Sequence, residues 1–258
     1  YLIKENEVLN DDAKHIIPCD IDTLTNEFNN KKPKFNIAWL KSIIEDDIRI
    51  KNYFNLFFKS SKHHEGYIIH KIISSLPKKS NLMIGNSSPI RDLDKFTFND
   101  SLGVNIFSNR GVSGIDGLIS TSIGISMNNK KNNFLILGDI SFFYDVSSLI
   151  NHASIASNLT IFILNNHGGQ IFNRLEGLKN EKKYKQHWLT PINLNIKDLA
   201  EAFKCGYFKI SSKTYKNINN IIIKSQKVKG IKLIEIDINA DKSLKINDKI
   251  DQEIAKIL

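Results

Sequence analysis

The chain has 258 residues, enough for one large α/β domain and part of a second, and it carries a formal net charge of +9. The lysines are scattered and form no basic patch, so no nucleic acid is expected as a partner. No apolar run approaches the length of a membrane span. The two cysteines, Cys19 and Cys205, lack neighbouring ligands, which argues against a disulfide framework or a zinc site and favours a reducing cytoplasm.

The N-terminal part of the chain does not show the pattern of a folded core. Residues 1–30 are polar and irregular, and the sequence begins with Tyr1 instead of Met, so we expect a fragment or a processed segment of a longer protein. We interpret residues 1–34 as the end of a preceding domain followed by a linker. Apolar side chains at helical spacing predict one or two helices over residues 35–59 and another over residues 65–76.

From residue 81 onward, short apolar strands alternate with helices. This alternation is typical of an α/β fold with a doubly wound parallel sheet, in which ligands bind at the carboxyl ends of the strands. The charged segment 176–186 is either a mobile lid or a solvated loop. The predicted strands span residues 81–84, 104–107, 133–137, 159–164, 207–210 and 231–238, and the predicted helices span residues 117–127, 141–156, 196–203 and 215–228.

Polar side chains follow two successive predicted strands. Asp139 comes directly after the strand at 133–137, and Asn166 follows the strand at 159–164. Because parallel strands end at the same edge of a sheet, we expect these side chains to lie close together, where their oxygens would suit Mg²⁺. The alternative is that Asp139 caps a helix and Asn166 shapes a turn.

The residues around Asp139 suit an anionic group. The backbone N–H groups of Ile140 and Ser141 lie at a predicted helix start, which favours phosphate, although Ser141 would also serve as a simple cap. Gly138 lacks a side chain and would let the backbone approach such a group closely.

The Gly-Asp and Asn-Asn elements, with the interval between them, resemble the motif of thiamine-diphosphate-dependent enzymes. Three further stretches are similar to one branch of that family, the 2-succinyl-5-enolpyruvyl-6-hydroxy-3-cyclohexene-1-carboxylate synthases of menaquinone biosynthesis. They are Gly85-Asn86-Ser87 with Arg91, the loop at 108–117, and the run from Asn165 to Phe172. The resemblance implies that residues 35–258 form the diphosphate-binding domain of the thiamine-diphosphate-binding fold and that residues 1–34 end the middle domain.

The resemblance also implies a ligand set for the cofactor. Thiamine diphosphate would bind with Mg²⁺ (or Mn²⁺), and the backbone carbonyl of Gly168 would be the third protein ligand of the metal beside Asp139 and Asn166. Ser113 and Ile115, both in the glycine-rich loop at 108–117, would bind the cofactor. Ile115 would support its folded shape, unless Ile115 is an ordinary core residue. His167 stands next to the proposed metal, and its role is left open.

Substrate residues follow from the same resemblance. Ser87, Arg91 and Arg110 would bind the carboxylates of 2-oxoglutarate and isochorismate, because guanidinium groups pair with carboxylates in a bidentate manner. The alternative for Arg91 is a surface ion pair with Asp92 or Asp94. Apolar side chains at helical spacing after the Asn-Asn turn form either a wall over the cofactor and substrate or part of the core: Ile171, Phe172 and Leu175.

The implied reaction is the decarboxylation of 2-oxoglutarate and the addition of the succinyl-semialdehyde carbanion to isochorismate, which is a transferase activity. The family activates its cofactor with a glutamate from an N-terminal pyrimidine-binding domain, which this chain lacks. We therefore expect the chain alone to be inactive and to belong to a homodimer or homotetramer. The alternatives are another thiamine-diphosphate carboligase or decarboxylase, and a non-catalytic remnant that binds the cofactor.

Overall fold

The computed structural model describes residues 2–3, 16–17, 19–29, 36–98, 103–127, 131–150, 158–175, 177–178 and 183–258. Parts of the segments predicted at 1–30, 141–156 and 176–186 lie outside these residues. The chain divides into two compact units, Tyr1–Ile48 and Arg49–Leu258, and the division falls within one helix, α2 (Ile37–Ser60). The domain limits expected from the sequence, 1–34 and 35–258, stay a prediction.

The first unit is more ordered than the sequence predicted. Two short parallel strands, β1 (Leu2–Ile3) and β2 (Ile16–Ile17), and the helix α1 (Ile21–Asn29) occupy a segment predicted to be irregular. The helix has a clear start signal, because the backbone N–H of Thr23 donates to the carboxylate of Asp20 at 2.7 Å. The prediction of an irregular segment was therefore wrong for α1.

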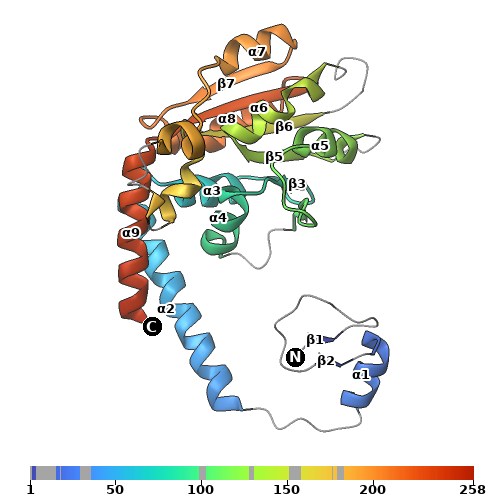
Figure 1. Cartoon of the computed structure of the whole chain (residues 1–258), viewed down its shortest axis with the longest axis vertical. Coiled ribbons are helices and arrows are strands. Elements are labelled where there is room, and N and C mark those ends of the chain that lie inside the picture. The colour runs from blue at the N-terminus through green and yellow to red at the C-terminus, as the bar shows by residue number, and fades with distance from the viewer. Residues whose placement is uncertain are drawn as a thin grey trace. The chain divides into compact units, whose positions relative to one another are not determined.

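Six parallel strands form the sheet of the second unit, in the order β4-β3-β5-β6-β8-β7 (Figure 1). The doubly wound parallel sheet predicted from the sequence is confirmed, and each strand lies within two residues of its predicted limits. The strands are β3 (Asn81–Ile84), β4 (Asn105–Phe107), β5 (Asn133–Gly138), β6 (Leu159–Asn165), β7 (Gly206–Ile210) and β8 (Ile231–Asp237).

Alternate residues of the strands pack into two hydrophobic cores, one on each face of the sheet. One core packs Ile84, Ile136 and Ile236 against helices that include α3 (Glu65–Ile73) and α8 (Ile218–Ser225). The other packs Leu135 and Ile163 against helices that include α5 (Leu118–Ser126) and α7 (Ile196–Ala202). Burial on both faces explains why the central strands are continuous apolar runs and do not alternate.

Two helices of this unit were not predicted. Helix α4 (Ser88–Phe96) begins directly after β3 and has a proline in its first turn, so Arg91 lies on a helix and not in a loop. Helix α9 (Ala240–Ile257) begins after Asn239, whose side chain accepts from the backbone N–H of Lys242 at 2.9 Å. Both carried recognisable start signals in the sequence.

Two helices differ in detail from their predictions. The helix expected at 141–156 begins earlier, at Asp139, as α6 (Asp139–Asp145), and continues as a 3₁₀ turn at Val146–Leu149. The helix expected at 215–228 is a 3₁₀ turn at Tyr215–Asn217 followed by α8. A short π-helix, Lys185–Leu189, follows the charged loop.

His64, which directly precedes helix α3, is buried. Only 1% of the residue is exposed, and its ring packs edge-on against Phe96 at a centroid distance of 5.0 Å. Burial lowers the pKa of His64 to about 4. Within the described part of the chain, no helix combines the length and the apolar character that a membrane crossing requires.

Candidate functional site

A cavity of about 290 Å³ opens at the carboxyl edge of the sheet. This volume lies near the lower end of ligand pockets, which measure roughly 300–1,000 Å³. The cavity brings together residues that follow β3, β5 and β6. Predicted site residues in its lining are Ser87, Ile115, Gly138, Asp139, Ile140, Ser141, Asn166, Gly168, Ile171 and Phe172.

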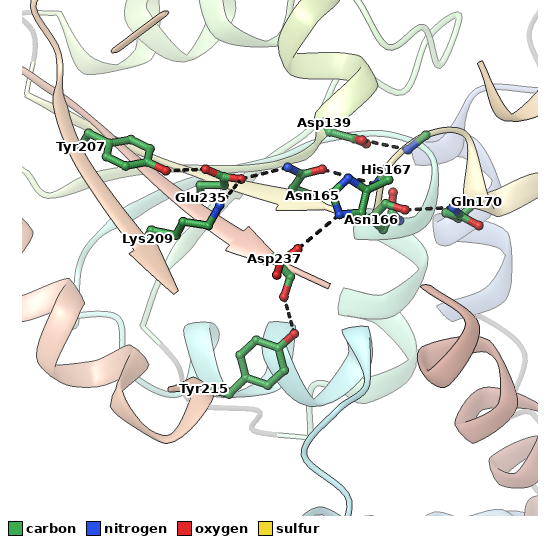
Figure 2. Close-up of polar contacts among 11 residues, drawn as sticks. Asp139, Asn165, Asn166, His167, Gln170, Tyr207, Lys209, Tyr215, Glu235 and Asp237 are labelled. Atoms are coloured by element: carbon green, nitrogen blue, oxygen red, sulfur yellow. Dashed lines mark hydrogen bonds and ion pairs between the residues drawn. The ribbon is translucent and has the colours of Figure 1, made fainter. Parts of the chain in front are cut away.

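Asp139 lies in the first turn of α6 and is 4% exposed. Its Oδ2 accepts the backbone N–H of Gly168 at 2.8 Å, so the loops after β5 and β6 are joined at this point (Figure 2). Burial raises the pKa of Asp139 to about 6, although hydrogen bonds from the backbone N–H groups of Ile140 and Gly168 oppose the shift. A nearby cation would restore the charged form.

Asn166 is 8% exposed, and its amide oxygen Oδ1 is buried without a hydrogen-bond partner. Its Nδ2 donates to Oε1 of Glu65 at 2.8 Å, which turns the unpaired oxygen away from that carboxylate. Buried polar atoms normally have a partner, so an unpaired oxygen at the edge of a cavity points to a missing ligand.

The loop that follows Asn166 is held in an unusual conformation. Gly168 has φ +129°, and a Cβ built there would lie 2.4 Å from the backbone oxygen of Leu189. Only glycine fits this position, because both the dihedral angle and the space exclude a side chain. The Gly168 carbonyl accepts from the backbone N–H of Gln170 at 2.8 Å and keeps a second lone pair for another partner.

A polar network fixes the base of the same loop (Figure 2). Asn165 donates from Nδ2 to Glu235 at 2.9 Å and accepts the backbone N–H of His167 at 3.3 Å. Tyr207 and Lys209 also donate to the Glu235 carboxylate. Asn165 is thus a structural residue of the Asn-Asn pair, whereas Asn166 faces the cavity.

These oxygens fit the ligand preference of a magnesium ion. A carboxylate from Asp139, an amide oxygen from Asn166 and a carbonyl from Gly168 are hard donors, and Mg²⁺ takes its remaining ligands from phosphate and water. Across the described residues, no three His, Cys, Asp or Glu side chains gather in a way that would hold a metal. A softer, transition-metal type of centre is therefore not indicated there.

Backbone strain marks the motif loops. Ser87, Ser113 and His167 have φ between 62° and 70°, although none of them is glycine. Such conformations cost of order 1–3 kcal/mol each and cluster at ligand-binding sites. The strain therefore coincides with three of the segments singled out from the sequence.

Two of the three apolar residues singled out after the Asn-Asn turn line the cavity. Ile171 and Phe172 line the cavity on the 3₁₀ turn Gln170–Arg174, and the ring of Phe172 packs against Trp188 at 5.2 Å. Leu175 is 51% exposed and lies outside the cavity lining. Trp188 is a lining residue that no sequence pattern indicated.

The predicted substrate arginines lie outside the cavity lining. Arg91 donates to the backbone oxygen of Ser87 at 2.7 Å, and Arg110 donates to Oδ1 of Asn86 at 3.0 Å. Both arginines are exposed, and so is Ser113, which also lies outside the lining. The roles predicted for these three residues are not tested by this geometry. Asp92, one of the alternative partners of Arg91, lies instead 3.6 Å from Arg174.

Glu65 is the main site residue that sequence reasoning missed. It begins helix α3, is 6% exposed and lines the cavity beside Asn166. Burial raises the pKa of Glu65, and burial together with the charge of Glu65 raises the pKa of Asp92 to about 7. Glu65 and Asn166 lie far apart in the sequence, and a single glutamate at a helix start gave no motif that would have linked them.

His167 does not contribute to the cavity lining. Its Nε2 lies 3.2 Å from Oδ1 of Asp237, and its side chain is 64% exposed (Figure 2). Both residues line a second, more open hollow of about 600 Å³. The question of a ligand or acid–base role for His167 stays open.

Comparison with known proteins gives one family and a set of relatives. Residues 102–236 match the family described as thiamine pyrophosphate enzyme, C-terminal TPP binding domain. Curated relatives named 2-succinyl-5-enolpyruvyl-6-hydroxy-3-cyclohexene-1-carboxylate synthase include a protein of Lysinibacillus sphaericus, which is 29% identical over 78% of this chain and 35% of its own length. The protein of Oceanobacillus iheyensis is 28% identical over 95% of this chain and 42% of its own length. The protein of Christiangramia forsetii is 39% identical over 60% of this chain and 28% of its own length. The chain thus spans less than half the length of these relatives.

Two solved structures share the fold. Benzoylformate decarboxylase from Polynucleobacter necessarius aligns over 69% of this chain and 33% of its own with a TM-score of 0.57 and 16% sequence identity. A putative thiamin diphosphate-dependent enzyme from Mycobacterium smegmatis aligns over 69% of this chain and 32% of its own chain, with a TM-score of 0.53 and 15% sequence identity. At this identity the likeness concerns the fold alone.

Proposed function

Because this chain belongs to the thiamine pyrophosphate enzyme family, whose C-terminal TPP binding domain its residues 102–236 match, we propose that it is the C-terminal part of a 2-succinyl-5-enolpyruvyl-6-hydroxy-3-cyclohexene-1-carboxylate synthase. The proposed enzyme serves menaquinone biosynthesis and joins 2-oxoglutarate, after loss of CO₂, to isochorismate. Support for the branch comes from the synthase relatives and from the Ser87, Arg110 and Asp139 motifs in chain order.

The observation that carries the proposal is the unpaired buried oxygen of Asn166 beside the carboxylate of Asp139. We assign Asp139, Asn166 and the carbonyl of Gly168 to the magnesium or manganese ion that would accompany the cofactor. When bound, the cofactor would supply the nucleophilic carbon that the decarboxylation of a 2-oxo acid requires. The task of this chain is to hold that group in a defined position.

Neighbouring residues would bind the diphosphate and shield the reaction from water. The N–H groups of Ile140 and Ser141 belong to the first turn of α6, where helix N–H groups lack intrahelical acceptors and suit phosphate. Ile115, Ile171 and Phe172 provide apolar surface in the cavity, which would exclude water from the reacting atoms.

We assign Ser87, Arg91 and Arg110 to the substrate carboxylates. Arg91 lies on helix α4, which follows β3, and Arg110 lies in the loop after β4, where it donates to the side chain of Asn86. Within the described part of the chain each guanidinium group makes one of these hydrogen bonds, which leaves further N–H donors for a carboxylate. To reach a substrate, these exposed side chains would have to move to the cavity mouth, and Ser113 would bind the cofactor from the same loop as Arg110. Leu175 would have to move in the same way to contribute to the apolar wall of the cavity.

The remaining features concern the whole enzyme. An N-terminal pyrimidine-binding domain would supply the activating glutamate, so we propose that this chain alone is inactive and works within a homodimer or homotetramer in the cytoplasm. The cofactor would be bound between two domains, which also explains why the cavity of this chain is small and open. The alternatives remain another thiamine-diphosphate carboligase or decarboxylase, and a cofactor-binding remnant.

The test uses the complete enzyme that contains this chain, supplied with thiamine diphosphate and Mg²⁺. We expect CO₂ release from 2-oxoglutarate. With isochorismate added, we expect formation of the succinylated product, which chromatography would detect. Turnover of another 2-oxo acid without activity on 2-oxoglutarate would favour a different carboligase or decarboxylase, and binding without turnover would favour the remnant. The chain alone is the control, and turnover of about 1 s⁻¹ or more would show that it contains its own activating base.

A further inference from the structure

The start of helix α3 is firmly placed beside the loop after β6. The backbone N–H of Glu65 donates to Oγ of Ser243 on α9 at 3.1 Å, in a buried contact between segments far apart in the sequence. From this fixed position the Glu65 carboxylate reaches Asn166, with 2.8 Å between Oε1 and Nδ2. Glu65 therefore touches the proposed metal ligand from the side of the helix.

This contact solves a problem that any asparagine ligand has. The oxygen and the nitrogen of an amide group are nearly identical in shape, so either one fits the same position. Only the oxygen binds a cation, whereas the NH₂ group is a donor. A carboxylate oxygen accepts hydrogen bonds, so it selects the orientation in which Nδ2 faces Glu65 and Oδ1 faces away.

The backbone of Asn166 is held as well, which limits the ways in which its side chain can move. Gln170 donates from Nε2 to the Asn166 carbonyl at 2.8 Å. Oδ1 is consequently the one polar atom of the side chain that has no partner, and it is buried. A buried amide oxygen without a partner is unfavourable, and a bound cation would remove that penalty.

We propose that Glu65 is a positioning residue, which fixes the amide of Asn166 with its oxygen toward the divalent cation without binding the metal itself. This inference rests on the proposed function, since it takes Asn166 as a metal ligand. It adds a residue outside the Gly-Asp and Asn-Asn motifs. Hydrogen-bond partners of metal ligands commonly contribute tenfold to hundredfold in metal affinity.

The experiment measures Mn²⁺ affinity by electron paramagnetic resonance at saturating thiamine diphosphate in the complete enzyme. Glu65→Ala should weaken Mn²⁺ binding about tenfold to hundredfold, because the amide then populates both orientations. Glu65→Gln should stay closer to the wild type, since its Oε1 still accepts from Nδ2. The single variant Asn166→Asp, which keeps Glu65, should weaken Mn²⁺ binding, because the new carboxylate and that of Glu65 repel each other.

The double variant Glu65→Ala with Asn166→Asp is the decisive case. Either oxygen of an aspartate at position 166 can bind the metal, so the orientation of this side chain no longer matters. Without the Glu65 carboxylate, the repulsion between two carboxylates is also absent. We expect the double variant to bind Mn²⁺ more tightly than either single variant. The matched control is Glu235→Ala, which removes a similarly buried carboxylate from the neighbouring Asn165, and Asn166→Asp should not rescue it.

A second measurement needs no metal. In the ¹⁵N-labelled 258-residue protein, the side-chain amide protons of Asn166 should exchange slowly in the wild type and in Glu65→Gln, and quickly in Glu65→Ala. Mn²⁺ affinity within twofold of the wild type for Glu65→Ala, or additive losses in the double variant, would overturn the inference. Absence of Mn²⁺ binding by the wild type would instead refute the proposed metal site, while the amide exchange would still decide whether Glu65 holds Asn166.

Discussion

Gly168→Ala is the most direct perturbation of the loop that carries the site. The new Cβ would lie 2.4 Å from the Leu189 backbone oxygen, and Gly168 has φ +129°, which side chains rarely adopt. Overpacking costs about 1–3 kcal/mol and the backbone strain costs about 1–3 kcal/mol. A backbone oxygen cannot rotate away as a side chain does, so we expect a loss of at least about 2 kcal/mol in the free energy of unfolding.

The matched control is Gly230→Ala. Gly230 has φ +81°, but a Cβ there would meet nothing within 4 Å, so this variant reports the strain without the clash. Urea denaturation of both variants gives the difference directly. If Gly168→Ala is no less stable than Gly230→Ala, the tight contact between the loop and Leu189 is not present in solution, and the reasoning about the site geometry fails.

Two further predictions concern a buried histidine and the substrate arginines. The pKa of His64 in the folded protein is about 4, below its ordinary value of 6.5. Between these two pH values the unfolded chain binds more protons than the folded protein. The free energy of unfolding therefore decreases as the pH falls from 6.5 to 4, by up to roughly 3 kcal/mol. His64→Phe should lose less stability between pH 7 and pH 4.5 in urea denaturation, and an unchanged loss would contradict the burial argument. Arg91→Ala and Arg110→Ala should each lower kcat/KM by about tenfold to hundredfold, with incomplete rescue by lysine, and unchanged kinetics would remove them from the site.

The fold was predictable where burial dominates the sequence pattern. The strands at β5, β6 and β8 are buried on both faces and therefore read as apolar runs of the right length. Helix α9 was missed because many of its residues are polar and exposed, and helix α4 because it is short and rich in polar residues, although Asn239 and Pro89 mark their starts. The burial of His64 could not be predicted from the sequence, because it depends on the packing of α3 and α4.

The site was predictable as far as its motifs follow strand ends. Asp139 and Asn166 meet because β5 and β6 are adjacent and parallel, which the sequence implied. The contact between Glu65 and Asn166 depends on where α3 lies relative to β6, and no local pattern contains that information. The placement of Trp188 depends in the same way on the path of a loop.

The central claim is that Asp139 and Asn166 hold the divalent cation of a bound cofactor. Calorimetric titration of the complete enzyme with thiamine diphosphate, in Mg²⁺ and in a chelator, tests it most directly, with Asp139→Asn as the comparison. The account predicts that Mg²⁺ strengthens cofactor binding in the wild type and has almost no effect in Asp139→Asn. Equal strengthening by Mg²⁺ in both proteins would contradict the assignment of Asp139 as a metal ligand.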